Sequence, residues 1–261
     1  MNLGLLDLSI LGPAFLAGLL VLSTHVPLGR EVLSRGIIFI DLAIAQIAGV
    51  GVIAADMFEF DLAWQVQLAA VSAALLGAAL LTWTDDKFAK IQEALIGVLF
   101  VLGATGAILL LSNNPHGGEK LKDLLVGQIL WVDLNSLVYV AVLYAGVLMV
   151  WFGMGRERLG AGGFYFLFAI TVTAAVQLVG IYLVFASLII PAVASRQYSG
   201  YRGLLIALSV GIMGYLIGMV ASAMYDLPTG AVVVWSLAAV GLLASIIVGR
   251  ATSSDRTLPL Q

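Results

Sequence analysis

Residues 159–195 read LGAGGFYFLFAITVTAAVQLVGIYLVFASLIIPAVAS, a run of 37 residues between Arg158 and Arg196 that contains no charged side chain. As a single helix this run would be roughly 55 Å long, far more than the ~30 Å hydrocarbon core of a bilayer. It therefore predicts two short crossings, or a re-entrant pair, that turn near Val179 and Gly180. We expect short or broken helices around residues 163–195, because such helices are tolerated where they line a path enclosed by protein.

The composition of the whole chain points the same way. Of the 261 residues, 62% are hydrophobic and 10% are charged, and the mean hydropathy is +1.10. Soluble domains carry about one quarter charged residues, so a water-soluble fold is excluded. The net charge of −3 gives no indication of nucleic-acid binding. The absence of cysteine excludes a disulfide framework, a thiolate metal site and a cysteine nucleophile.

The other uncharged stretches each match one crossing. They contain 20 to 25 residues, and only one of them is interrupted by a charge, Asp41. A membrane-spanning helix needs about 20 apolar residues. The stretches are residues 8–29, 36–55, 62–84, 94–118, 134–155, 203–225 and 227–249. The sequence thus predicts an all-α, polytopic transmembrane helical bundle of about eight or nine crossings, forming a single domain over residues 1–261.

The cationic loops predict the orientation. If the 37-residue run returns to its own side, ten of the twelve lysines and arginines fall on one side of the membrane. Lys120 and Lys122 fall on the other. The positive-inside rule places the larger set in the cytoplasm, with the N-terminus outside and the C-terminus cytoplasmic. The larger set is Arg30, Arg35, Lys87, Lys90, Arg156, Arg158, Arg196, Arg202, Arg250 and Arg256.

Three features lie on the predicted outer side. Residues 1–7 lack a positively charged region, so we expect no cleaved signal peptide there. Residues 113–118 are rich in turn formers and lead into residues 120–131, which predict a short amphipathic or half-inserted helix. An external hairpin follows at Tyr225, Asp226, Pro228 and Gly230. Asp226 lies near the start of the next helix, where capping alone could account for it.

Asp41 is the only charge predicted inside a span. A carboxylate at depth costs about 2.5–3.5 kcal/mol unless it is compensated, so such residues are functional candidates. We interpret Asp41 as a metal ligand. The alternative is that Asp41 sits in the first two turns of its helix, favoured by the helix dipole and by Arg35 nearby. Small residues follow on the same face, at Ala45, Ala48 and Gly49.

Three uncharged polar residues also fall inside predicted spans. His25 could lie at the depth of Asp41 and complete a metal site, or it could bond a backbone carbonyl freed by Pro27. Gln46 lies about 140° around the helix from Asp41. This position favours an interhelical hydrogen bond beside the transport path over a role as a second metal ligand. Gln177 could line the path or satisfy the backbone of a broken helix.

The chain lacks the common catalytic motifs. No phosphate-binding loop is present, because no Gly-Lys pair occurs anywhere in the sequence. If transport is driven by ATP, the ATPase must be another polypeptide. No zincin helix and no nucleophile elbow occurs either, so an enzyme is not predicted.

Four segments in order resemble the membrane permeases of metal-ion ABC importers, the family that serves zinc, manganese and iron uptake. Residues 179–196, VGIYLVFASLIIPAVASR, are similar to the family signature VG-x-LLV-x-ALLIIPAATAR. Residues 225–230, YDLPTG, are similar to its YD-x-P-x-G turn. The stretches EALIGVLF at 93–100 and LLVGQIL at 124–130 also match. The order and spacing hold from about Pro27 to Gly249.

The resemblance implies a homodimer in the lipid bilayer, with two cytoplasmic ATPase subunits and an extracytoplasmic metal-binding protein. ATP then binds the partner subunits, this chain holds no cofactor, and a divalent metal is the transported substrate. The segment after Ile190 and Pro191 is implied to form a cytoplasmic coupling helix that docks into the ATPase. An ordinary basic loop is the alternative. The residues concerned are Ala192, Ser195, Arg196, Gln197, Tyr198 and Arg202.

One position departs from the family pattern. The family carries Asp-x-x-x-His in its second helix, one helical turn apart, as a ligand pair. Here Asp41 occupies the aspartate position, but Ala45 stands in place of the histidine and Ile40 in place of the preceding glycine. Only Asp41 is therefore carried over, and His25 is the candidate that could replace the missing imidazole.

The predicted function is the permease subunit of an ATP-driven importer of a divalent metal, zinc first and manganese or iron next, working by alternating access. An ion-coupled secondary transporter or a channel is a second class, although no second membrane carboxylate is predicted to relay protons. An intramembrane aspartyl protease built on Asp41 and Asp226 is a third. It would require both carboxylates within hydrogen-bond reach, whereas they are predicted near opposite sides of the membrane.

Overall fold

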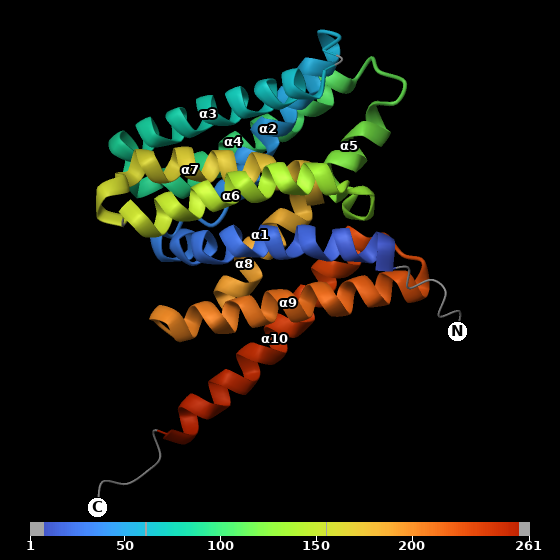
Figure 1. The fold of residues 1–261 in the computed structure, drawn as a ribbon. Helices are drawn as coiled ribbons and strands as arrows, with labels where there is room; N and C mark the ends of the chain where they lie inside the picture. The colour runs from blue at the N-terminus through green and yellow to red at the C-terminus, as the bar shows by residue number, and fades with distance from the viewer. Residues whose placement is uncertain (1–7, 61, 155, 256–261) are drawn as a thin grey trace, which may run out of the picture.

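A computed structural model of the chain describes residues 8–60, 62–154 and 156–255, and this part of the chain is helical and contains no strand. Figure 1 shows long helices lying side by side in a bundle, with α8 crossing its interior. The helices are α1 (Leu8–Arg35), α2 (Ile40–Met57), α3 (Ala63–Phe88), α4 (Gln92–Leu111), α5 (Gly117–Val126), α6 (Leu134–Met154), α7 (Arg156–Val179), α8 (Ile181–Ala194), α9 (Gly200–Tyr225) and α10 (Thr229–Asp255), with 3-10 turns η2 (Ala89–Ile91) and η3 (Ile129–Trp131).

The predicted fold class, an all-α bundle of membrane-spanning helices, is confirmed. Within the described residues, 7 helical segments are long and apolar enough to cross a membrane. One of them, Ala63–Leu111, contains both α3 and α4, which η2 separates. The number of crossings and the orientation of the termini stay predictions. The expectation about a signal peptide concerns residues 1–7, which lie outside the described residues.

The uncharged run reverses where the sequence predicts. α7 ends at Val179, Gly180 follows with φ 81°, and α8 begins at Ile181. Two short crossings, or a re-entrant pair, were expected. Only α8 is short, whereas α7 is long enough to cross the membrane by itself. α8 has 14 residues, about 21 Å of helix. α7 has 24 residues, interrupted near its start by non-helical Gly160.

The short helix α8 lies in the middle of the bundle. It packs against α1, α2, α5, α7, α9 and α10. Ile181, Leu183, Val184 and Leu188 are fully buried. Gly29 of α1 lies so close to the backbone carbonyl of Leu188 that a Cβ atom there would collide with it. A short helix is tolerated at this depth because protein, rather than lipid, surrounds it.

Three of the segments that carry the family resemblance meet at one junction. Gly127, just after α5, and Gly180 both have positive φ, 72° and 81°. A Cβ atom on either glycine would collide with the backbone of the other segment. Gly230 adjoins the same place, because a Cβ atom there would collide with the carbonyl oxygen of Val126. Glycine is required here for close backbone approach as well as for φ.

The chain before this junction contains the amphipathic helix that was predicted over residues 120–131, but with different bounds. The helix α5 begins earlier, at Gly117, and ends at Val126. Gly127 and Gln128 then separate it from the 3-10 turn η3. Gly127 takes φ 72° and ψ 172°, a conformation that a helix cannot continue. The predicted short helix is therefore present, but it stops where the chain packs against the α7–α8 reversal.

Replacing Gly180 by Ala should destabilise the protein strongly. Its φ of 81° and ψ of 160° lie in a region essentially confined to glycine. The strain alone should lower the thermal midpoint in detergent by about 4 °C or more. Gly146→Ala in α6 is the matched control, since nothing lies within 4 Å of its Cβ position. Equal thermal midpoints for Gly180→Ala and Gly146→Ala would contradict the role of the junction.

Candidate functional site

Asp41 is the second residue of α2 and is fully buried. Neither of its carboxylate oxygens has a hydrogen-bond partner among the described residues. The residue at the N-cap position is Phe39, and no side chain caps α2. Asp41 therefore benefits from the helix dipole by position but does not cap its helix by hydrogen bonding.

Arg35, the cation that could have compensated Asp41, is engaged elsewhere. Its Nε donates a hydrogen bond to Oε1 of Glu31 at 2.8 Å, within α1. Its guanidinium carbon lies 4.4 Å from the ring centroid of Phe164, in a cation–π contact. The structure thus leaves the Asp41 carboxylate without a salt bridge among the described residues. An isolated buried carboxylate is costly to maintain, which favours a functional reason for it.

His25 is fully buried on α1, and its two ring nitrogens differ in surroundings. Nδ1 lies 2.9 Å from the carbonyl oxygen of Val21 and 3.1 Å from the hydroxyl of Thr24. Nε2 has no hydrogen-bond partner among the described residues. The carbonyl that Pro27 frees is that of Ser23, four residues before it, so His25 does not bond that one. A hydrogen on Nδ1 donated to Val21 leaves the lone pair on Nε2, the form in which imidazole binds metals.

Tyr144 of α6 lies beside His25, in the region of the bundle that also contains Asp41. The rings of His25 and Tyr144 have centroids 6.4 Å apart. Asp41 and Tyr215 of α9 lie in the wider surroundings of Tyr144, close enough for a charge on either to act on its hydroxyl. Its hydroxyl donates to the carbonyl oxygen of Thr171 at 3.1 Å. Tyr144 is therefore a direct neighbour of His25, and Asp41 lies in the same region of the bundle.

Further polar groups extend this neighbourhood. The hydroxyls of Ser187 in α8 and Tyr215 in α9 lie 2.8 Å apart, and both residues are fully buried. The polar cluster, as we name it, consists of Thr24, His25, Asp41, Tyr144, Ser187 and Tyr215. It draws on α1, α2, α6, α8 and α9. Within the described chain, no group of three or more His, Asp or Glu side chains is close enough to hold a metal ion by itself.

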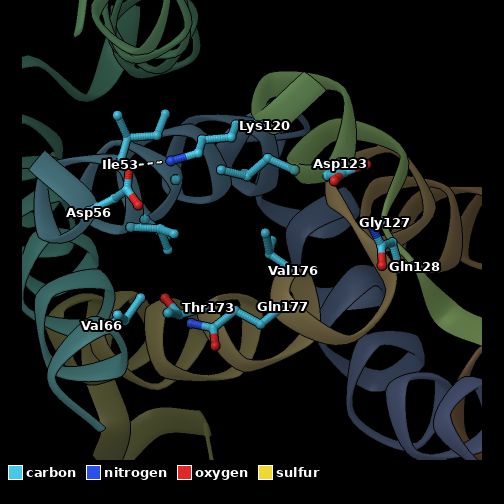
Figure 2. A pocket seen from close by; sticks show the side chains of 14 residues that line it. Ile53, Asp56, Val66, Lys120, Asp123, Gly127, Gln128, Thr173, Val176 and Gln177 are labelled. Atoms are coloured by element: carbon cyan, nitrogen blue, oxygen red, sulfur yellow. Dashed lines mark hydrogen bonds and ion pairs between the residues drawn. The ribbon is translucent and has the colours of Figure 1, made fainter. Parts of the chain in front are cut away.

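A cavity of about 400 Å³ opens between α2, α3, α5 and α7, and we call it the vestibule. Figure 2 shows Asp56 and Lys120 facing each other, with Asp123 and Gln128 nearby and Thr173 and Gln177 on α7. Lys120 forms an ion pair with Asp56, which ties α5 to the end of α2. Polar groups from three helices thus surround a cavity at one end of the bundle.

The vestibule and Asp41 share one face of α2. Ala48 and Gly49 line the cavity, and with Ala45 they follow Asp41 at helical spacing, as the sequence analysis noted. Gly49 lies about 12 Å along the helix axis from Asp41. Ala45 and Ala48 are buried and Gly49 packs against Leu124, so this face of α2 is closely packed between the two.

The two glutamines assigned to the path do not come together. Gln177 lines the vestibule. Gln46 is 5% exposed and lines a different cavity, of about 560 Å³, with Phe100, Tyr182 and Trp235. Of the two, Gln177 is thus placed at the cavity that adjoins the Asp41 face of α2.

The segment predicted to meet an ATPase differs from the expected coupling helix. α8 continues through Pro191 to Ala194, and only a turn separates it from α9, which begins at Gly200. Ala192 and Ser195 are buried, 1% and 0% exposed, so they cannot contact a partner in this packing. Arg196, Gln197 and Arg202 are exposed, and Tyr198 is half-buried. We call residues 195–202 the coupling segment.

Arg30 of α1 holds the coupling segment in place. Its Nη2 donates to the carbonyl oxygen of Tyr198 at 2.7 Å, and its Nη1 donates to that of Gly200 at 2.9 Å. Hydrogen bonds from a charged donor are about twice as strong as neutral ones. The same helix carries His25 a little more than one turn away, so α1 joins the coupling segment to the polar cluster.

The hairpin of Tyr225, Asp226, Pro228 and Gly230 links α9 with α10. Asp226 ends α9 in a left-handed conformation, φ 51°, rather than capping α10. The hydroxyl of Ser222 donates to the carbonyl oxygen of Leu227 at 2.7 Å and completes the turn. Gly230 packs at the junction described above. This hairpin therefore has a structural role in the fold of the chain.

Sequence reasoning did not single out Tyr144, Tyr215, Ser187 or Arg30. The three uncharged residues look like ordinary apolar or small positions in a span, and only their convergence from separate helices makes them a cluster. Arg30 was counted only as a loop cation. Its distinguishing signal is that it lies three residues after Pro27, inside the end of the first span.

Arg30→Ala should loosen the coupling segment. Because the chain has no cysteine, Ser195→Cys, at a position of the same segment that is 0% exposed, provides a single reporter thiol that reacts only when the segment opens. Loss of the two carbonyl hydrogen bonds should raise the rate at which a maleimide modifies this thiol by about threefold or more. Arg202→Ala removes an exposed cation from the same segment and serves as the control. Equal rates in both backgrounds would show that Arg30 does not hold the segment.

Comparison with known proteins identifies the family to which the chain belongs. A family model described as the ABC 3 transport family matches residues 7–160 and 159–248. A relative described as a probable metal transport system membrane protein, from Chlamydia muridarum, is 22% identical over 255 residues, covering 89% of this chain and 86% of that protein.

Two solved structures share the fold. PsaBC from Streptococcus pneumoniae, in complex with Fab, superposes with a TM-score of 0.73 at 19% identity and 92% coverage of both chains. An inward-facing conformation of a putative metal-chelate type ABC transporter gives a TM-score of 0.64 at 18% identity, covering 93% of this chain and 85% of that one. Because the family match spans nearly the whole chain, the chain belongs to the ABC 3 transport family.

Proposed function

We propose that the chain is the membrane-spanning permease subunit of an ATP-driven importer of a divalent metal, with zinc favoured and manganese or iron next. The observation that carries the proposal is the fully buried Asp41 carboxylate, which has no hydrogen-bond partner among the described residues. It lies in the same region of the bundle as His25, whose Nε2 likewise has no hydrogen-bond partner among the described residues. A passing cation would compensate this carboxylate only while it is bound.

The chemistry of the donors favours zinc among divalent metals. Zinc is commonly bound by imidazole nitrogen together with carboxylate oxygen. Metal-binding histidines usually donate their other ring N–H to a carbonyl or carboxylate, which orients the ring. His25 has such a partner in the carbonyl of Val21. This supports His25 as the imidazole that replaces the one absent at Ala45.

The vestibule offers an approach to this site. Asp56 is paired with Lys120 there, so the Asp123 carboxylate would supply the net negative charge that attracts a cation, and Gln177 offers a neutral oxygen ligand. The small residues of α2 lead from there toward Asp41. In the proposed cycle, ATPase closure acts on the coupling segment and switches the exposure of Asp41 from the outer to the inner side. Gln46 faces a separate cavity and would act as a wall of the path rather than as a ligand.

The partners follow from the same proposal. A cytoplasmic ATPase would contact the exposed residues Arg196, Gln197 and Arg202, and ATP would be bound there rather than by this chain. An extracytoplasmic metal-binding protein would deliver the ion to the vestibule. The chain would act as a homodimer in the cytoplasmic (inner) membrane. The names of its relatives support metal as the cargo.

The competing functions lack a supporting arrangement. Arg30 ties the start of α9 to the end of α1, and α9 has 26 residues, about 39 Å. Asp226 at the far end of α9 is thus remote from Asp41, so a protease dyad is contradicted. For a proton-coupled transporter, Glu31, the second carboxylate that is buried among the described residues, is engaged with Arg35.

Asp41→Asn should reduce zinc uptake at matched membrane levels by about tenfold or more, because even outer-shell contacts are worth about 10–100-fold to a metal site. Asn keeps shape and hydrogen bonding, so the protein should remain folded. Asp226→Asn is the control, since Asn suits a left-handed helix end and lies outside the path. Normal uptake of zinc, manganese and iron by Asp41→Asn would leave Asp41 with a structural role only.

Ala45→His should change metal preference rather than abolish transport. It places an imidazole one turn from Asp41, restoring the pair seen in the family pattern. Uptake of zinc, manganese and iron, each supplied separately under chelation, measures the change. An unchanged ratio among the three metals would show that position 45 does not face the ion.

The purified chain alone should show no ATP hydrolysis above background, because it has no phosphate-binding loop. Hydrolysis is measured with and without the co-expressed ATPase subunit. Robust activity of the isolated chain, free of contaminating ATPase, would overturn the assignment to a permease subunit.

A further inference from the structure

A groove runs between α1, α6 and α9, away from the polar cluster and the vestibule. Two cavities of about 240 Å³ and 500 Å³ share Pro27, Phe152 and Leu204 in their walls and therefore adjoin. Figure 1 shows α1, α6 and α9 running nearly parallel in this part of the bundle. The proposed metal path uses neither cavity.

The smaller cavity is apolar and lies along the helices. Its walls include Leu19, Leu148, Leu208 and Ile212. The one hydroxyl there, that of Ser23, donates to the carbonyl oxygen of Leu20 at 2.6 Å, so its polarity is satisfied within α1. Such a surface suits a hydrocarbon chain and offers nothing to a polar ligand.

The larger cavity is polar and positively charged. Arg30, Ser34 and Ser199 line it, and among the side chains that the structure describes no acidic one lines either cavity. Two hydrogen bonds to carbonyls of the coupling segment fix the position of the Arg30 guanidinium, which stays protonated. Ser199 is the N-cap residue of the 26-residue helix α9, and its side chain makes no capping bond. The first amides of α9 and the helix dipole add to the positive potential.

We propose that this groove binds an anionic phospholipid, with the phosphodiester at Arg30 and Ser199 and one acyl chain along the apolar cavity. An amphiphile with a negative head and a hydrocarbon tail matches both halves of the groove. The polar half lies at the end of the bundle that carries Arg196 and Arg202, the end predicted to face the cytoplasm. Basic pockets between membrane helices on that side bind anionic headgroups.

The bound lipid would touch the coupling segment. Ser199, Gly200 and Tyr201 line the polar cavity, and the carbonyl of Gly200 is one of the two that Arg30 holds. The headgroup would thus fasten the start of α9 to α1 and to Trp151 of α6. Lipid binding does not depend on which ion the protein carries, so it can be tested without a transport assay.

The test is native mass spectrometry of the purified chain with phosphatidylglycerol or phosphatidylcholine of identical acyl chains. Phosphatidylglycerol should be retained about five- to tenfold better, the effect expected of one cation near a headgroup. Ser199→Asp places a negative charge at the headgroup position while supplying a good N-cap, so folding is preserved. Ser199→Asp should remove the preference for phosphatidylglycerol over phosphatidylcholine. Ser199→Asn, an equally good N-cap without charge, should keep that preference.

A second pair of variants tests whether an acyl chain occupies the apolar cavity. Leu208→Trp narrows the apolar cavity and should reduce retention of both lipids, whereas Leu205→Trp, at an exposed position on the same helix that lines neither cavity, should not. Equal retention of the two lipids by the unchanged chain would overturn the proposal. So would equal loss in Ser199→Asp and Ser199→Asn, or in both tryptophan variants, because binding would then be an unspecific lipid annulus.

Discussion

The close packing of Gly180 against Gly127 determines where the chain reverses between α7 and α8. The reversal exposes the last carbonyls of α7 and the first amides of α8, and burying these backbone groups requires close packing by protein. The junction provides that packing, because α5 and the start of α10 meet the reversal through glycines that permit close approach. With the reversal placed there, α8 lies in the middle of the bundle, and its Ser187 reaches Tyr215. The polar cluster could not assemble if α8 crossed the membrane at full length on the outside.

Two buried acidic side chains near the proposed site differ in their partners. Glu31 and Asp41 are both buried, 6% and 0% exposed. Arg35 engages Glu31 and stacks on Phe164, and Asp41 has no salt bridge among the described residues. Asp41 is left among tyrosines, small residues and the imidazole of His25. A carboxylate in such surroundings is stabilised far more by a mobile cation than by any fixed group of the chain.

The sequence was informative wherever one residue type carried the signal. The uncharged run predicted the reversal at Gly180, the lone charge in a span pointed to Asp41, and Gln177 lies at a cavity. It could not identify polar groups that converge from different helices. Tyr144 and Tyr215 are unremarkable within their own spans. The coupling helix was expected from resemblance alone, and here α8 simply continues to Ala194, which buries Ala192 and Ser195.

Zinc X-ray absorption of the purified chain tests the central claim most directly, that His25 and Asp41 face the transported ion. The chain has 2 histidines, so His116→Asn, purified without a histidine tag, leaves His25 as the only imidazole. The account predicts an imidazole at a zinc–nitrogen distance of about 2.0–2.1 Å and its disappearance in His25→Ala. A zinc spectrum without imidazole, or one that His25→Ala leaves unchanged, would contradict it.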